Sequence, residues 1–240
     1  MSENNVPLPH DPPLEVADDL FVVYGCVKPN PGVRFSRNMT IVRDGDELTL
    51  INPVLMSEEN LQKLDALGEV KHVLRLGPMH GMDDEFYVQR YNAAFWAFAD
   101  GVTYTKPDID HPLSEQGGLP FGRAKFFVFK HLKETEGAIL LERSNNILLT
   151  CDAIQSYATP PYHLHTNLFT SLMMPFIGFG KRTLIGPVWV KLLAEDKDSI
   201  KGEFQRLVEW DFDQLLAAHG TFLPNNAKAE VQVAIDKMFG

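Results

Sequence analysis

The sequence has few of the features that mark secreted, membrane-spanning or nucleic-acid-binding proteins. Only two of its 240 residues are cysteines, Cys26 and Cys151, which excludes a disulfide-stapled scaffold and favours a reducing, cytoplasmic setting. No apolar stretch approaches the roughly eighteen residues that a membrane-spanning helix needs, and residues 168–180, the longest, include a proline and two glycines. The N-terminus lacks the basic and apolar regions of a signal peptide, so we expect residues 1–18 to form a loose polar lead.

Basic residues are also scarce. Acidic side chains outnumber Lys and Arg by 32 to 22, and the formal net charge is −10. A field of that sign repels a phosphate backbone, and no Lys/Arg cluster offsets it, so we expect neither nucleic acid nor a membrane as a partner. The remaining composition, 45% hydrophobic and 22% charged, is that of a soluble globular protein, and a small-molecule substrate is a possible partner. The length fits one domain over residues 1–240. We interpret residues 168–183 as core, or as a lid or the surface of a homodimer; core or subunit contact is favoured over a substrate groove.

Turn and capping signals divide the first third of the chain into strands and a helix. Residues 21–27 read as a short strand. Residues 38–54 read as two strands joined at Asp44-Gly45-Asp46, because Asp-Gly favours the positive φ of a tight hairpin turn. Ser57 is a good helix N-cap, and the leucines that follow it recur at helical spacing, so residues 56–68 are predicted to be a helix that leads into a strand over residues 70–76.

Further helices and strands alternate along the rest of the chain. A helical face is predicted from the spacing of Tyr87, Tyr91, Ala94, Phe95 and Phe98. Further strands are expected within residues 101–107, 124–132, 137–143, 145–154 and 213–218, loops within 106–122 and 160–167, broken helices within 167–195, and amphipathic helices around 200–208 and 227–239. This mixture predicts an α/β or α+β fold in which helices cover sheets.

Three apolar strands end immediately before a side chain that can bind a metal. His80 and Asp84 follow one strand, Asp152 follows a second, and His219 follows a third. A rigid strand fixes such a side chain while the loop beyond it stays open to a ligand. Imidazole and carboxylate are good ligands for Zn²⁺, Fe and Mn²⁺. Each residue alone also fits an ordinary role as a turn or helix cap, but together they predict a metal site.

Two histidines and a cysteine extend the list of candidate ligands. His163 and His165 lie in a loop soon after Asp152, and an extended loop would turn both side chains the same way. The alternative for both is a loop in which they only form hydrogen bonds. Cys151 is either a small buried apolar group or a thiolate ligand beside Asp152.

The order of these segments resembles the metallo-β-lactamase fold superfamily. The resemblance covers about residues 35–235 and is carried by "NPVLMSEENLQKLDALGEVKHVLRLGPMHGMDDEF", "ETEGAILLERSNNILLTCDAI" and "LLAAHGTF". It implies an α+β fold, a four-layer αβ/βα sandwich with two sheets face to face. Laid on this chain, the family's His-x-His-x-Asp-His run falls on His80, Met82, Asp84 and Glu85, and its later ligands fall on Glu134, Asp152 and His219.

The departures from the family pattern limit the metal that the resemblance implies. A thioether at Met82 is a weak ligand, and glutamates favour harder ions such as Fe or Mn²⁺. The resemblance therefore implies a site with one divalent ion (Zn, Fe or Mn) or none, rather than two zinc ions.

Two functions follow from the resemblance. One is a metal-dependent hydrolase of a small ester, lactone, thioester or phosphoester that acts through a metal-bound water, with Asp84 as a ligand or as the group that orients or deprotonates this water. The other is a catalytically inactive binding or interaction module with the same fold.

Overall fold

The computed structural model describes residues 6–101, 103–160, 165–180 and 182–240. Its larger sheet has seven strands in sequence order, with antiparallel pairs from β1 to β4 and parallel pairs from β4 to β7. These strands are β1 (Leu14–Ala17), β2 (Leu20–Asn30), β3 (Val33–Asp44), β4 (Glu47–Ile51), β5 (Glu69–Leu74), β6 (Ala94–Ala97) and β7 (His111–Pro112).

The second sheet has the strand order β13-β10-β9-β8, and β10 pairs with β13 in parallel. Its strands are β8 (Ala124–Val128), β9 (Gly137–Leu141), β10 (Ile147–Thr150) and β13 (Gln214–Ala217). A small antiparallel pair is formed by β11 (Ile154–Ser156) and β12 (Thr183–Ile185).

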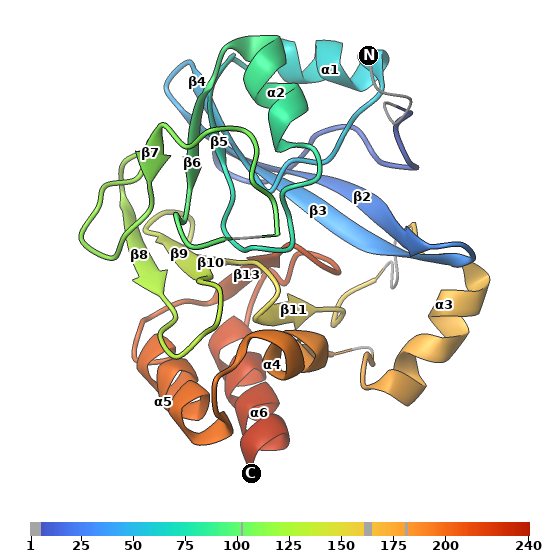
Figure 1. The fold of residues 1–240 in the computed structure, drawn as a ribbon, viewed down its shortest axis with the longest axis vertical. Coiled ribbons are helices and arrows are strands. Elements are labelled where there is room, and N and C mark those ends of the chain that lie inside the picture. Colours follow the sequence, from blue (N-terminus) through green and yellow to red (C-terminus); the bar gives the residue numbers. More distant parts are fainter. Residues whose placement is uncertain (1–5, 102, 161–164, 181) are drawn as a thin grey trace.

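Helices cover the outer faces of the two sheets, except that α3 and η1 lie beside the end of the β2–β3 hairpin. They are α1 (Glu58–Asp65), α2 (Asp84–Tyr91), α3 (Leu168–Met173), the 3-10 helix η1 (Met174–Ile177), α4 (Pro187–Leu193), α5 (Lys197–Leu207) and α6 (Ala227–Phe239). Figure 1 shows α1 and α2 at one end of the molecule against the larger sheet, and α4, α5 and α6 at the other end beyond the second sheet. The predicted α+β fold, a four-layer αβ/βα sandwich, is therefore confirmed.

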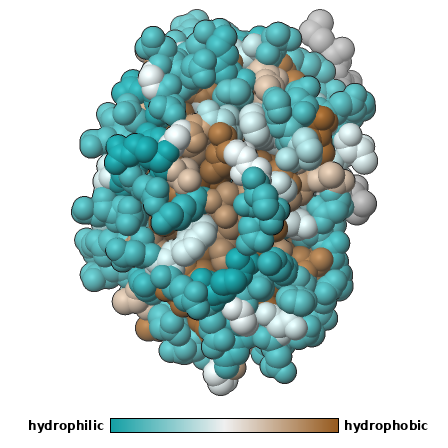
Figure 2. Space-filling view, turned by 90° about the vertical axis from the view of Figure 1, so that its left-hand side faces the viewer, coloured by the Kyte–Doolittle hydropathy of each residue, from teal (hydrophilic) through white to brown (hydrophobic). Residues whose placement is uncertain are grey.

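Strand periodicity divides the core into three layers. Alternate residues of β2 point to opposite faces, so Leu20 and Val22 pack between the two sheets while Phe21 and Val23 pack under α1 and α2. In β9, Leu140 joins the cluster under α4–α6 and its neighbours join the cluster between the sheets. Strands covered on both faces are apolar throughout, which explains the unbroken hydrophobic runs of the sequence. On the face shown in Figure 2, hydrophilic side chains form most of the outer surface around a hydrophobic central area.

Most of the predicted local elements are present. The loose lead expected over residues 1–18 was wrong for Leu14–Ala17, which form β1 and pair with β2. The hairpin at Asp44-Gly45 and the helix after Ser57 are confirmed as β3–β4 and α1. The helix predicted as far as Phe98 was wrong: it ends at Tyr91, Asn92 is left-handed, and β6 follows. The strand predicted over residues 101–107 was also wrong, because in its described part main-chain oxygens accept hydrogen bonds from the Arg75 guanidinium.

The apolar stretch over residues 168–180 is not the core segment that was predicted. It forms α3 and η1, and one face of these helices is exposed to solvent at Leu168, Phe169, Leu172 and Phe176. Contact with a second subunit through this face stays a prediction. Within the described ranges, no helix combines the length and the apolar character that a membrane span requires.

Candidate metal centre

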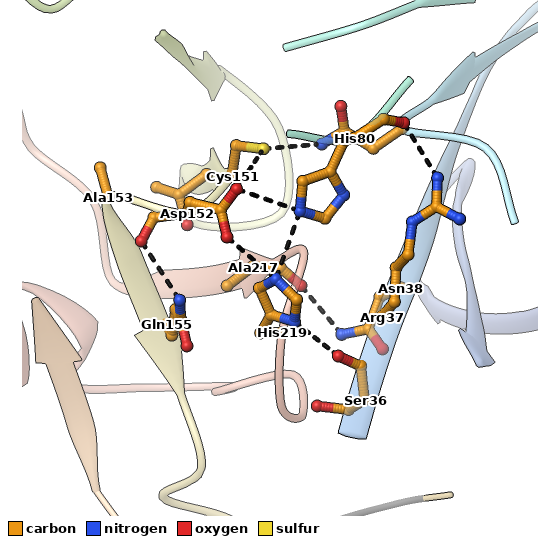
Figure 3. Close-up of polar contacts among 12 residues, drawn as sticks. Ser36, Arg37, Asn38, His80, Cys151, Asp152, Ala153, Gln155, Ala217 and His219 are labelled. Atoms are coloured by element: carbon orange, nitrogen blue, oxygen red, sulfur yellow. Dashed lines mark hydrogen bonds and ion pairs between the residues drawn. The ribbon is translucent and has the colours of Figure 1, made fainter. Parts of the chain in front are cut away.

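The sheet topology brings three of the predicted side chains to one point. Strands β10 and β13 are parallel neighbours in which Thr150 pairs with Ala217, so Asp152 and His219, each two residues further on, leave the same end of the sheet side by side. His80 reaches them from the loop between β5 and α2 in the facing sheet. Figure 3 shows the three side chains turned toward one another between the sheets.

The three side chains are in direct contact and are buried. The Nε2 atom of His219 lies 3.0 Å from Asp152 Oδ1 and 3.2 Å from His80 Nε2, and His80 Nε2 lies 3.2 Å from Asp152 Oδ2. Two atoms bound to a common ion at about 2.0–2.2 Å, at angles between square and tetrahedral, are roughly 3.0–3.5 Å apart. The separations among these ligand atoms therefore match a set that faces a single ion.

The charges in the cluster also favour a cation. Burial acts to raise the pKa of Asp152, but His80 and His219 outweigh it and hold this pKa far below its usual value, so the group is a carboxylate. Burial lowers the pKa of His80 against the opposing effect of Asp152, so its ring is neutral near pH 7. A carboxylate buried between imidazoles carries a negative charge that a divalent cation would neutralise.

The hydrogen bonds of His219 fix which of its nitrogens can bind a metal. Its Nδ1 lies 2.5 Å from the main-chain oxygen of Ser36, which only accepts hydrogen bonds, so Nδ1 carries the proton. In the neutral ring the Nε2 lone pair is then directed at His80 and Asp152. A backbone acceptor behind the ring is the usual support of a metal-binding histidine. The chemistry of the donor set therefore fits a metal ion.

Cys151 is close enough to act as a further donor. Ligand atoms of His80, Cys151 and Asp152 all lie within 4.8 Å of one another. Burial, together with the charges of Glu136 and Asp152, raises the pKa of the Cys151 thiol well above its usual value, so the group is a neutral thiol in the protein alone. A bound metal would deprotonate a coordinating thiol outright.

Three consecutive polar residues of β3 hold the loops that carry the histidines. Arg37 donates to Asp83 over 2.6 Å and to the main-chain oxygen of His80 over 2.9 Å. Asn38 donates to the main-chain oxygens of Ala217 and Gly220, which flank His219. The Ser36 hydroxyl accepts from the Gly220 amide.

All three of these β3 residues are buried, although each has a polar side chain. Figure 3 shows them on the side of the cluster opposite Asp152. The β3 residues 36–38 therefore position both histidines.

A second buried carboxyl lies behind the cluster. Glu136 accepts a hydrogen bond from the Ala153 amide over 2.7 Å, and burial together with the Asp152 charge raises the pKa of Glu136 well above its usual value. A Cβ at Gly77 would lie 2.6 Å from Glu136 Oε2 and 2.7 Å from Cys151 Sγ. Glycine is therefore required where the His80 loop passes these two side chains.

Asp84 is not part of the cluster, which corrects the prediction of this residue as a ligand and as the group that orients the water. It is the first residue of α2, is fully buried, and accepts from Arg75 Nε over 2.6 Å. Burial raises the pKa of Asp84 to about 6, although Arg75 acts in the opposite direction. The Asp84 carboxylate pairs with the Arg75 guanidinium instead of facing the cluster. The spacing of residues in the sequence does not reveal this pairing.

The other predicted ligands do not join the cluster either. Glu134 interacts with Thr103 at the surface. His165 lies elsewhere, with its Nε2 atom 3.1 Å from Asp11 Oδ1. His163 lies outside the described residues. The carboxyl at the back of the site belongs to Glu136, two positions after the residue that the family pattern selected.

The contributions of Glu136 and of residues 36–38 were not predicted from the sequence. The signal in the sequence that could have found them is a polar residue at a strand position that is expected to be buried. Glu136 directly precedes the fully buried β9, and residues 36–38 lie in the buried middle of β3. Polar groups at buried strand positions need partners, and here the partners are the loops of the site.

A cavity of about 500 Å³ opens beside the three side chains. His80, Asp152 and His219 contribute to one part of its wall. Most of the remaining wall is apolar. It includes Val27, Val33 and Phe35 of the β2–β3 hairpin, Met174 of η1, Phe179, and Trp189 of α4. The candidate metal centre is therefore next to a space that can hold an organic molecule.

Comparisons with known proteins agree on the fold and on little else. The sequence matches no protein-family model, and no curated protein matches it significantly. Among solved structures, the metallo-β-lactamase FIM-1 from Pseudomonas aeruginosa in its mono-zinc form superposes with a TM-score of 0.66 at 12% identity, over 97% of this chain and 96% of that one.

Two further structures give the same result. TMB-1 gives a TM-score of 0.65 at 11% identity, over 97% of this chain and 99% of that one. A metallo-β-lactamase from Pontibacter korlensis gives 0.62 at 12% identity, over 95% and 99% of the respective chains. Similarity along nearly the whole length of each chain, at so low an identity, shows the architecture alone. The chain therefore has the metallo-β-lactamase fold.

Proposed function

We propose that this protein is a hydrolase that holds one divalent metal ion with His80, Asp152 and His219 and acts on a small ester, lactone, thioester or phosphoester. The observation that carries the proposal is the convergence of three buried ligand atoms, 3.0–3.2 Å apart, at the wall of a cavity. The fold adds support, because the FIM-1 structure with the same architecture is a mono-zinc form.

One ion accounts for the ligands better than two. The side chain of Met82, at a hallmark position of the family pattern, is 53% exposed and offers only a weak thioether donor. Asp84 is engaged by Arg75, and Glu134 is engaged at the surface. We therefore assign Zn²⁺, Fe²⁺ or Mn²⁺ to one position, where Cys151 would be a further donor.

The protein's own residues prepare the site for hydrolysis. When bound, the ion would supply Lewis-acid activation of a water molecule and of the substrate carbonyl or phosphoryl oxygen. His219 keeps its proton on Nδ1, which donates a hydrogen bond to the Ser36 main-chain oxygen, so that Nε2 stays directed at the centre. The Arg37 guanidinium holds the loop of His80 by donating to the main-chain oxygen of His80. The apolar wall beside the centre excludes water from the bound substrate.

Metal content is the direct test. Protein purified without chelator is expected to contain about one equivalent of a transition metal by elemental analysis. His80→Ala and Asp152→Ala should each lose most of it, because a three-ligand site cannot spare a ligand. His131→Ala is the matched control, since this exposed histidine lies near Glu195 and away from the centre.

Less than about a tenth of an equivalent, with no uptake on titration with Zn²⁺, Fe²⁺ or Mn²⁺, would reject the proposal. Stoichiometric metal without hydrolysis of any ester, thioester or phosphoester would instead identify a catalytically inactive binding module with a structural metal.

A further inference from the structure

Building on the proposed function, we propose that the cavity beside His80, Asp152 and His219 takes a substrate with an uncharged apolar chain, such as the acyl group of a medium-chain ester or lactone. The cavity has a volume of about 500 Å³, which lies within the range of sites for small organic ligands. Its composition decides which of the substrate classes fits.

Much of the apolar wall of the cavity comes from two segments that are separate in the sequence. The β2–β3 hairpin contributes Val27, Pro29, Val33 and Phe35. The second segment contributes Met174 of η1, Phe179, and Val188 and Trp189 of α4. Apolar side chains from both segments suit an alkyl chain, because each methylene that enters the cavity is removed from contact with water.

The charged groups in the wall do not offer a free cation. Among the described residues that line the cavity, Arg37 is the only Lys or Arg. Its guanidinium already donates to Asp83 over 2.6 Å and to the His80 main-chain oxygen over 2.9 Å. One divalent ion held by the Asp152 carboxylate would leave the centre with at most one net positive charge. A phosphoester dianion or a second carboxylate in the substrate would therefore be buried with part of its charge unbalanced, which is costly. A neutral ester, lactone or thioester has no such cost.

The two walls are fixed to each other before any ligand binds. Asn167 caps α3, and its side-chain amide donates to the Gly32 main-chain oxygen over 2.7 Å. The main-chain amide of Asn167 donates to the Arg34 main-chain oxygen over 3.1 Å. The Arg34 amide donates in turn to the Thr170 hydroxyl. These bonds join α3 to the end of the β2–β3 hairpin, so the cavity is preformed and little ordering opposes binding.

Chain-length dependence tests the inference without the metal. In calorimetric titrations of the metal-free protein with 1-butanol, 1-hexanol and 1-octanol, we expect the affinity to rise about threefold to fourfold per methylene. Val33→Phe should narrow the cavity and reduce the affinity for 1-octanol several-fold. Val233→Phe is the matched control, because Val233 is an exposed residue of α6 outside the cavity. Equal affinities for the three alcohols would overturn the inference.

Activity gives the second arm. With the metal-loaded protein, kcat/KM for p-nitrophenyl esters should rise from acetate to octanoate, mainly through KM, and p-nitrophenyl phosphate should not be hydrolysed. A preference for acetate or for the phosphate would overturn the inference while leaving the hydrolase proposal standing. Chain-length-dependent alcohol binding without hydrolysis of any ester would reject the hydrolase and support the apolar ligand class.

Discussion

The Nδ1 atom of His219 donates to the main-chain oxygen of Ser36 over 2.5 Å, and this bond joins the end of β13 to the middle of β3. The Ser36 hydroxyl strengthens the connection by accepting from the Gly220 amide over 3.1 Å. The histidine that faces Asp152 is thus oriented by a residue 183 positions earlier in the chain. The geometry of the candidate metal centre therefore depends on β3 as well as on its own ligands.

Ser36→Ala is expected to weaken metal binding without removing a ligand. The change leaves the buried Gly220 amide without its hydroxyl acceptor, so the turn that carries His219 loosens. Loss of an outer support of a metal ligand typically costs about tenfold to a hundredfold in affinity. Competition with a chromogenic chelator measures this affinity. Ser57→Ala is the control, since the Ser57 side chain forms no capping hydrogen bond; equal weakening in both variants would contradict the assigned role.

Arg37→Met is expected to lower the free energy of unfolding by about 3–5 kcal/mol, because it leaves the largely buried Asp83 carboxylate without its partner. It also releases the His80 loop. Arg90→Met is the matched control: the Arg90–Glu58 pair is exposed, and such pairs contribute about 1 kcal/mol or less. Urea denaturation compares the two variants. Similar losses of stability would show that Arg37 has no special structural role.

Asp84 predicts a pH dependence of stability. Burial raises its folded-state pKa to about 6 against the effect of Arg75, whereas the unfolded value is near 3.8. The folded state therefore binds more protons between these values, and the contribution of Asp84 to stability falls as pH rises from about 4 to 6.

The measurement compares wild type with Asp84→Asn. The stability of wild type relative to this variant should decrease by up to about 3 kcal/mol over that pH interval in urea titrations. Asp18→Asn, at a surface position, should show no such trend. A wild-type advantage that grows with pH would mean that Arg75 dominates and would contradict the prediction.

Gly77→Ala is expected to destabilise the protein by about 1–3 kcal/mol through overpacking. The new Cβ would lie 2.6 Å from a Glu136 carboxyl oxygen and 2.7 Å from Cys151 Sγ, and both side chains are buried. Gly202→Ala gives the opposite sign, because Gly202 lies within α5 and a Cβ there would meet open space, so alanine should stabilise the helix by about 0.5–1 kcal/mol. Thermal unfolding of both variants measures the difference, and a stable Gly77→Ala variant would show that the His80 loop can shift.

Local sequence signals were sufficient wherever short-range chemistry decides the structure. The Asp44-Gly45 turn, the N-terminus of α1 at Ser57 and the amphipathic stripe of α5 are all set by neighbouring residues. The helical spacing from Tyr87 to Phe98 was misleading because Ala94 and Phe95 belong to β6. The pairing of β6 with β5 on one side and β7 on the other outweighs the helical periodicity.

The sequence by itself determined the order of strands and helices and marked His80, Asp152 and His219, because strand alternation, caps and strand ends are written into adjacent residues. Only the tertiary structure decided that these three side chains meet, that Asp84 pairs with Arg75 instead, and that Glu136 rather than Glu134 lies behind the site. Burial, charge pairing and the facing of two sheets depend on contacts between residues distant in the chain, and no local pattern encodes them.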